Sequence, residues 1–211
     1  MKMNPEGRRE LATPIYQQDY EGEKNITKEQ IEFRALRTCV PACLFMLGAE
    51  EGYFDGAEAV KNYQTYINNL DWTDFDMERG WIRPNLAQKL RNLYGMEIVS
   101  WREGVEPDIE KMKQAGYLNS EKEEAFFKNT VYGKKLAEIV QSGYPVLVGV
   151  KPGFGTNKQS HGVIILSWTN EEVVVQDPDN RNPKNIYTPE YIESYLNPNG
   201  GGYTIVLPKE K

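Results

Sequence analysis

The sequence predicts an α+β fold in which helices come first and an antiparallel sheet follows. Residues 27–142 carry apolar side chains at helical spacing between helix caps and stops, whereas residues 143–211 carry short β-branched runs separated by turn residues. Helical and strand segments that are segregated along a chain are typical of α+β proteins. We therefore expect residues 1–211 to form a single domain, in which 1–26 is a polar extended arm, 27–142 is mainly helical and 143–211 is mainly sheet.

The most apolar of the expected helices begins near Pro41 and runs to about Glu50. Proline suits the first turn of a helix because its missing N–H would have no partner there. Because this segment is apolar on almost every side, the helix should lie in the middle of the protein. Capping residues, further first-turn prolines and terminating glycines predict the other helices, at 27–36, at 55–70, at 84–94 with Leu86, Leu90 and Leu93 on one face, at 107–142 with a break near Asn129, and from 188 onward.

Short β-branched runs bounded by turn residues predict the strands. Thr169, Asn170 and Glu171 form a tight turn between two of these runs, which should therefore pair as a hairpin. The expected strands are 96–101, 145–150, 162–168, 173–176 and 203–207.

Composition and charge exclude several classes of protein. Lys and Arg total 25 and Asp and Glu total 31, a formal charge of −6, and there is no basic cluster. Such a chain is poorly suited to phosphate backbones, so we expect no nucleic-acid partner. The longest nearly apolar run, 39–49, is too short to span a bilayer, and no apolar stretch follows the charged residues near the start. We therefore expect a cytoplasmic protein with no membrane partner.

The chain has two cysteines, Cys39 and Cys43, and a single histidine, His161. A disulfide between residues four apart would close too short a loop to add much stability. A structural zinc site usually takes four ligands in paired knuckles, and these residues supply at most three with no second knuckle. We therefore expect neither a disulfide scaffold nor a metal site, and no cofactor is implied.

Cys39 is the better candidate for a nucleophile. A thiol reacts as the thiolate, and a helix N-terminus together with a histidine lowers its pKa. Cys39 stands just before the Pro41 turn, where unpaired backbone N–H groups and the helix dipole favour negative charge. Cys43, one turn further into an apolar helix, is expected to be an inert core residue.

His161 and Asp177 are expected to meet across the hairpin. His161 begins one strand, Asp177 follows the other, and the two are nearly equidistant from the turn at 169–171. A carboxylate beside an imidazole fixes its tautomer and stabilises the imidazolium. The sequence therefore permits Cys39, His161 and Asp177 as nucleophile, base and orienting carboxylate. Each residue alone also fits an ordinary role in a core or a turn, but their coincidence favours a site.

Four segments carry the motifs of one known family. The segment 39–42, Cys-Val-Pro-Ala, is similar to a Cys-Gly-Pro-Ala/Thr segment that opens a buried helix, and 93–98 is similar to a helix that ends in Tyr-Gly before a strand. Residues 139–150 are similar to a Gly-x-Pro strand, and 161–178 to a His…Asp-Pro hairpin. Over roughly 11–208 the chain thus resembles the papain-like cysteine peptidases of the bacteriocin-leader-processing (double-glycine leader) type and their free-standing bacterial relatives.

This resemblance implies a papain-like fold, in which a helical lobe with Cys39 on a buried helix packs on an antiparallel sheet with His161 and Asp177. It implies a cysteine peptidase that hydrolyses peptide or isopeptide bonds of a peptide or protein substrate through a Cys-His-Asp triad and an acyl-enzyme intermediate. Gln18, in a segment similar to the family's Val-Pro-x-x-x-Gln strand, takes the place of the oxyanion-hole glutamine, with Gln17 as the alternative.

Val40 stands where the family has a glycine, and a side chain there is expected to crowd the substrate side of the cleft or to alter the oxyanion backbone. Two other functions stay open. One is an acyltransferase or amidase that uses the same triad and passes the acyl group to an amine or a small thiol. The other is a catalytically inactive peptide-binding protein with the same fold.

Overall fold

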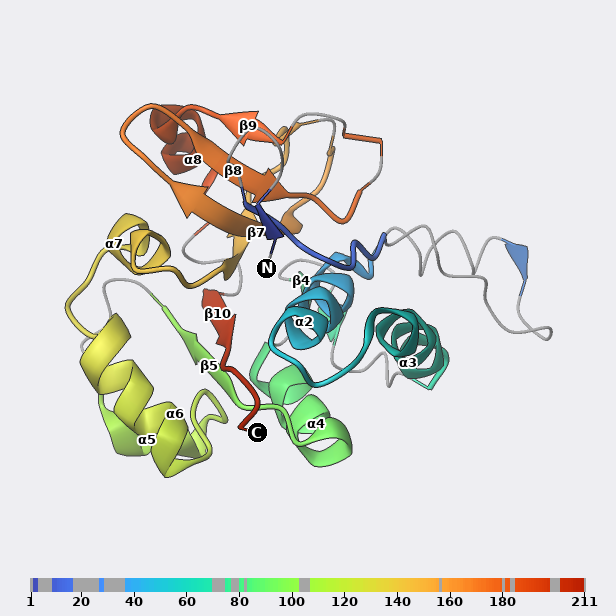
Figure 1. Ribbon diagram of the computed structural model, residues 1–211, viewed down its shortest axis with the longest axis vertical. Coiled ribbons are helices and arrows are strands. Elements are labelled where there is room, and N and C mark those ends of the chain that lie inside the picture. The colour runs from blue at the N-terminus through green and yellow to red at the C-terminus, as the bar shows by residue number, and fades with distance from the viewer. Residues whose placement is uncertain are drawn as a thin grey trace.

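The computed structural model describes residues 2–3, 9–16, 27–28, 37–69, 75–76, 80–81, 83–102, 107–155, 157–179, 181–182, 185–197 and 202–210. Helices packed on a six-stranded antiparallel sheet make up most of this part of the chain, and the predicted α+β architecture is confirmed (Figure 1). No helix among these residues is both long enough and apolar enough to cross a membrane.

The main sheet has the strand order β5-β10-β6-β7-β8-β9, and every neighbouring pair is antiparallel. The last strand of the chain therefore lies inside the sheet, between the earliest strand and the others. Its strands are β5 (Ile98–Trp101), β6 (Val146–Val150), β7 (His161–Trp168), β8 (Val173–Gln176), β9 (Ile186–Tyr187) and β10 (Tyr203–Val206). Two small ribbons pair β1 (Lys2–Met3) with β2 (Arg9–Glu10) and β3 (Phe75–Asp76) with β4 (Gly80–Trp81).

Two groups of helices cover opposite sides of the sheet, as Figure 1 shows. On one side lie α2 (Cys39–Glu50), α3 (Gly56–Asn68) and α4 (Arg83–Tyr94). On the other lie α5 (Ile109–Gln114), α6 (Glu121–Phe126), the π-helical turn η3 (Phe127–Val131) and α7 (Leu136–Gln141), while α8 (Pro189–Tyr195) packs beside β9.

The sheet separates two apolar cores, because successive side chains of a strand point to opposite faces. On β7, Ile164 and Leu166 belong to the core with α2, whereas Val163 and Ile165 belong to the core with α7. Both faces being covered explains why almost every residue of β6 and β7 is apolar and buried.

The central helix α2 is buried from Cys39 to Gly48, as its uniformly apolar sequence predicts. It begins at Cys39, two residues before Pro41, so the proline lies in the first turn. Cys39 is consequently the first helical residue, and its own N–H is one of those that have no acceptor within the helix.

The predicted helix at 107–142 is divided differently from the expectation. The prediction of a break near Asn129 is wrong, because Asn129 lies inside η3 and the chain remains helical through it. The interruptions fall instead after α5 and after η3, where Gly116 and Gly133 have φ of +76° and +74°. Only glycine adopts such a backbone easily, so these two residues end the helices.

Two further expectations differ from the structure, and one cannot be compared. The arm at 1–26, expected to be polar and extended, contributes to the core, since Leu11 and Ile15 are buried beside α2. Leu93 is 63% exposed, because the neighbouring Tyr94 packs on the rings of Phe45 and Phe54 in its place. Most of the predicted helix at 27–36 lies outside the described residues.

A buried ion pair between Arg91 and Glu123 joins α4, α6 and β5. Arg91 of α4 donates through Nε and Nη2 to both oxygens of Glu123 in α6, at 2.9 and 3.0 Å. Glu123 also accepts from the N–H groups of Ile98 and Asn119, at 2.6 and 2.5 Å. These bonds fix β5 and α6 relative to α4 and offset part of the cost of burial, which still raises the pKa of Glu123.

Candidate active site

The thiol of Cys39 lies at the N-terminus of α2, 8% exposed. Thr38, the residue before the helix, is fully buried, and its Oγ1 accepts from the Tyr63 hydroxyl of α3 at 2.8 Å. The backbone N–H groups of Val40 and Gly162 and the side chain of His161 all hydrogen-bond to the thiol. The sulfur therefore faces donors from both the helix and the sheet.

His161 is the first residue of β7, and its Nε2 lies 2.5 Å from Oδ1 of Asp177, just after β8. The predicted hairpin brings them together: β7 pairs with β8 in antiparallel register, with one irregularity between Ile165 and Ser167. Both side chains are 4% exposed. Since Nε2 is occupied by Asp177, Nδ1 is the ring nitrogen left for Cys39.

The electrostatics of the pair favour a thiolate and an imidazolium. Burial by itself raises the pKa of Cys39, but the charge and hydrogen bond of His161 and the two backbone N–H groups outweigh it, so the pKa is lowered. Burial by itself lowers the pKa of His161, but the Cys39 thiolate and the Asp177 carboxylate outweigh it and raise this pKa to about 10. The charged form of each group is thus stabilised by the other.

Cys43 has the opposite character. It is fully buried, and its Sγ donates to the carbonyl of Gly162 at 3.6 Å. Burial, together with the nearby charges of Cys39 and Asp177, raises the pKa of this thiol well above its ordinary value. The prediction that Cys43 is an inert core residue agrees with these contacts.

The Val40 side chain packs inward against the sheet. Val40 is 7% exposed, and its Cγ2 lies where a Cβ on Gly162 would come within 2.9 Å of it. The glycine that follows His161 thus makes room for the valine that follows Cys39. Val40 beside the thiol therefore has a role in the packing of the core.

Arg83, the first residue of α4, is a buried cation close to both thiols. It is 3% exposed, and its Nη1 donates to the carbonyls of Leu147 in β6 and Gly202 before β10. Burial lowers the pKa of Arg83 to about 10, and the charges of Cys43 and Cys39 oppose that effect. Arg83 thus adds positive potential behind the N-terminus of α2.

Three of the residues singled out in the sequence, Cys39, His161 and Asp177, come together in the structure. Gln18 and Gln17 lie outside the described residues. Sequence reasoning missed two polar neighbours, Asn182 and Arg83. Asn182 had only the turn composition around it, whereas a cation at a helix N-terminus opposes the helix dipole and is a signal that could have drawn attention to Arg83.

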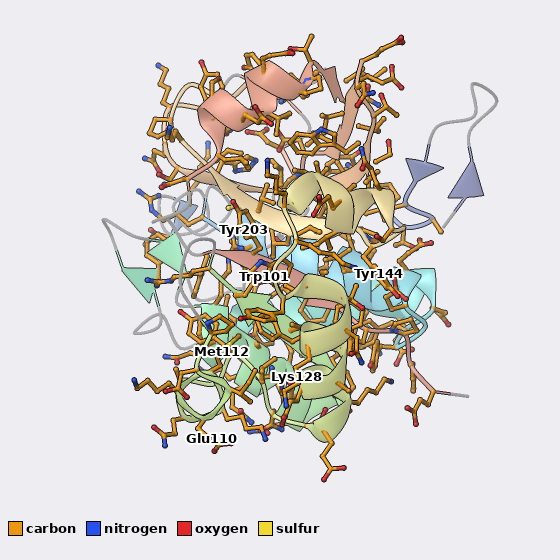
Figure 2. All side chains as sticks on the ribbon, turned by 90° about the vertical axis from the view of Figure 1, so that its left-hand side faces the viewer. Trp101, Glu110, Met112, Lys128, Tyr144 and Tyr203 are labelled. Atoms are coloured by element: carbon orange, nitrogen blue, oxygen red, sulfur yellow. The ribbon has the colours of Figure 1, made fainter. Side chains whose placement is uncertain are left out.

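A hollow of about 330 Å³, away from Cys39, opens on the face of the sheet that α5 covers. Figure 2 views this face: Trp101 and Tyr203 lie side by side at the ends of β5 and β10, and Met112 of α5 lies next to them. The residues that line the hollow include no cysteine or histidine. They are Trp101, Arg102, Pro107, Asp108, Lys111, Met112, Ala115, Tyr117 and Phe127. No group of three metal-ligating side chains occurs among the residues that the structure describes.

Comparison with known proteins gives one informative finding. No protein-family model matches the chain, and no curated protein matches it. Among solved structures, the chain is similar to the crystal structure of a candidate C39-like peptidase from Bacillus anthracis, with a TM-score of 0.48 and 13% sequence identity. The alignment covers 83% of this chain and 90% of that one.

Proposed function

We propose that this protein is a cysteine peptidase that hydrolyses peptide or isopeptide bonds. The observation that supports it best is the Cys39 thiol at a helix N-terminus, hydrogen-bonded to an imidazole that Asp177 holds at 2.5 Å. A lowered thiol pKa and a raised imidazole pKa are what a thiolate nucleophile and a general acid require.

In the proposed reaction, the Cys39 thiolate attacks the carbonyl carbon of the scissile bond. The oxyanion accepts from the backbone N–H of Cys39 and, following the family resemblance, from the side chain of Gln18 or Gln17. The His161 imidazolium gives its proton to the leaving amine as the carbon–nitrogen bond breaks. Neutral His161 then takes a proton from water, which attacks the acyl-enzyme and releases the carboxylic acid and the thiolate.

The first test measures alkylation of both cysteines by iodoacetamide from pH 5 to 9, read by peptide mass spectrometry. We expect Cys39 to react well below pH 8 and much faster than Cys43, which serves as an internal control. In His161→Ala the reaction of Cys39 should slow and follow the ordinary thiol profile. Equal, slow reaction of both thiols in the wild type would overturn the proposal and favour a peptide-binding protein without turnover.

The second test separates hydrolysis from acyl transfer. The protein is incubated with a peptide library with and without a primary amine, and the products are identified by mass. A peptidase forms free carboxylic acids under both conditions. Products that carry the added amine in preference to water would instead identify an acyltransferase with the same triad.

A further inference from the structure

The carboxylate of Asp177 is held from both of its oxygens. Oδ1 lies 2.5 Å from Nε2 of His161 and accepts a hydrogen bond from the backbone N–H of Asp179 at 2.8 Å. Oδ2 accepts a hydrogen bond from Nδ2 of Asn182 at 2.8 Å. Rotation about the last side-chain bond of an aspartate is soft, so contacts at both oxygens are needed to keep one of them aligned with the imidazole.

Asn182 is itself fixed on two further sides. Its Nδ2 also donates to the Tyr187 hydroxyl of β9 at 3.0 Å. On the other side stands Gly155, where a Cβ would overlap the Asn182 amide. The absence of a side chain at position 155 therefore leaves the space that the amide occupies.

An aromatic cluster holds the segment that carries Gly155. Phe154 is fully buried, and its ring contacts those of Tyr187 and Tyr191 at centroid distances of 4.9 and 5.8 Å. The Gly155 N–H donates to the Tyr191 hydroxyl at 3.3 Å. The loop after β6 is thus tied to α8 and to β9, and β9 also supports Asn182.

We propose that Asn182 is a positioning residue for the Cys39–His161 pair, acting through Asp177. Its donation to Oδ2 keeps Oδ1 directed at His161, and Gly155 preserves the space in which the amide can do so. This inference deepens the proposed function, because the alignment of Asp177 sets how strongly the imidazolium is stabilised. It applies to the geometry of the site whether or not a substrate is known.

The test uses the single histidine of the chain as its reporter. In a Cys39→Ala background, the ring ¹⁵N signals of His161 titrate without the thiolate, so their pKa reports the contact with Asp177. Asn182→Leu keeps the approximate size of the side chain and removes the donor. We expect the pKa of His161 to fall by roughly one unit in this variant, because Oδ1 of Asp177 is then less well aligned and its hydrogen bond to the imidazolium weakens. A hydrogen bond to a charged group contributes about that much.

Two glycine variants provide an independent reading. Gly155→Ala should lower the pKa of His161 in the same direction, because its methyl group displaces the Asn182 amide. Gly153→Ala is the matched control: it has a positive φ of +93° in the same loop, but its Cβ would meet the Tyr195 ring. This control should leave the pKa of His161 unchanged although it strains the same loop.

The inference is overturned if folded Asn182→Leu and Gly155→Ala both titrate like the Cys39→Ala parent, or if Gly153→Ala lowers the pKa of His161 equally. If Asn182→Leu does not fold, as judged by circular dichroism, Gly155→Ala against Gly153→Ala decides the question. Failure of the proposed function is a separate result, since it appears as slow alkylation of Cys39 in the otherwise wild-type protein.

Discussion

At the scale of single residues, Cys39 and His161 differ from their neighbours because each stabilises the charge of the other. Neither charge would be favourable alone at so buried a position, since burial opposes both. The pair survives burial because the thiolate also accepts from two backbone N–H groups and the imidazolium also faces Asp177. Its effects should therefore be visible in stability as well as in reactivity.

The pair should contribute stability that is lost in alkaline solution. In the unfolded chain His161 loses its proton near pH 6.5 and Cys39 near pH 9.0, whereas in the folded protein the first pKa is raised to about 10 and the second is lowered. Between pH 9.0 and about 10 the unfolded pair therefore binds no proton, whereas the folded pair still binds one on His161. Since stability falls with rising pH wherever the folded state binds more protons, the contribution of the pair should fall through this window.

Urea unfolding of the wild type and of Cys39→Ala/His161→Ala, repeated from pH 5 to 10, measures this contribution. The difference in the free energy of unfolding between the two proteins should decrease from pH 9 to pH 10. A difference that stays constant or increases over this interval would contradict the raised pKa of His161.

Arg83 should affect the reactivity of Cys39 through its charge. Removing the charge in Arg83→Met should raise the pKa of Cys39 and slow its alkylation at pH 6 by several-fold, because a nearby cation favours the thiolate. Arg83→Lys retains the charge and should alkylate more like the wild type. If the two variants alkylate with identical pH profiles, the charge of Arg83 does not act on the thiol.

At the scale of elements, the helices owe their positions to a few buried polar contacts as well as to apolar packing. The bidentate pair between Arg91 and Glu123 is one of these: it bonds α4 to α6, and Glu123 also accepts from the N–H of Ile98 in β5. Removing one partner leaves the other buried and uncompensated, which is far more costly than losing an exposed pair.

Glu123→Gln should lower the free energy of unfolding by about 3–5 kcal/mol, measured in urea. The matched control is Glu124→Gln in the same helix, which removes ion pairs with Lys113 and Lys128 at the surface. This control should cost much less, because surface pairs are screened by water. Similar losses in the two variants would show that the buried pair is not special.

Local signals in the sequence were sufficient for most elements. Asp55 caps α3 by accepting from the N–H of Glu58, Gly95 follows α4 with φ of +66°, and Thr188 caps the helix that Pro189 begins, all as predicted. These features depend on residues within one turn of each other, so spacing alone reveals them.

The predictions failed where a distant partner decides the outcome. The exposure of Leu93 depends on which side chain of that turn reaches Phe45, and the burial of Ile15 depends on its packing in the core that contains α2. In the site, His161 and Asp177 were predictable because a hairpin brings them together. Asn182 and Arg83 were not, since their roles depend on a bent turn and on the packing of α4 against β6.

At the scale of the whole molecule, the sheet is completed by the end of the chain. β10 pairs with β5 on one side and with β6 on the other, so it joins the helical part to the strands that carry His161. Without β10, the edge strand β5 would be separated from the main sheet, β6 would lose one of its two partners, and the core on both faces would open.

A chain that ends at Gly202 should therefore fail to fold, whereas a chain that ends at Leu207 should keep the fold. The longer form retains all of β10 and loses only peripheral contacts, including the bond from the Lys209 N–H to Glu51 and the exposed pair of Lys122 with Glu210. Circular dichroism and thermal melts of both forms check this. Cooperative melting of the chain that ends at Gly202 would mean that β10 is dispensable.

The position of β10 also has a consequence for the order of folding. Its pairing with β5 joins residues that lie far apart along the chain, such as Tyr203 and Trp101. Pairing of such distant strands is slow, because the entropy of closing a long loop is lost before the contacts form. In the main sheet, β5 is connected only through β10 to the strands that carry His161 and Asp177. We therefore expect the thiol to become reactive in a late step of refolding, after the individual helices have formed.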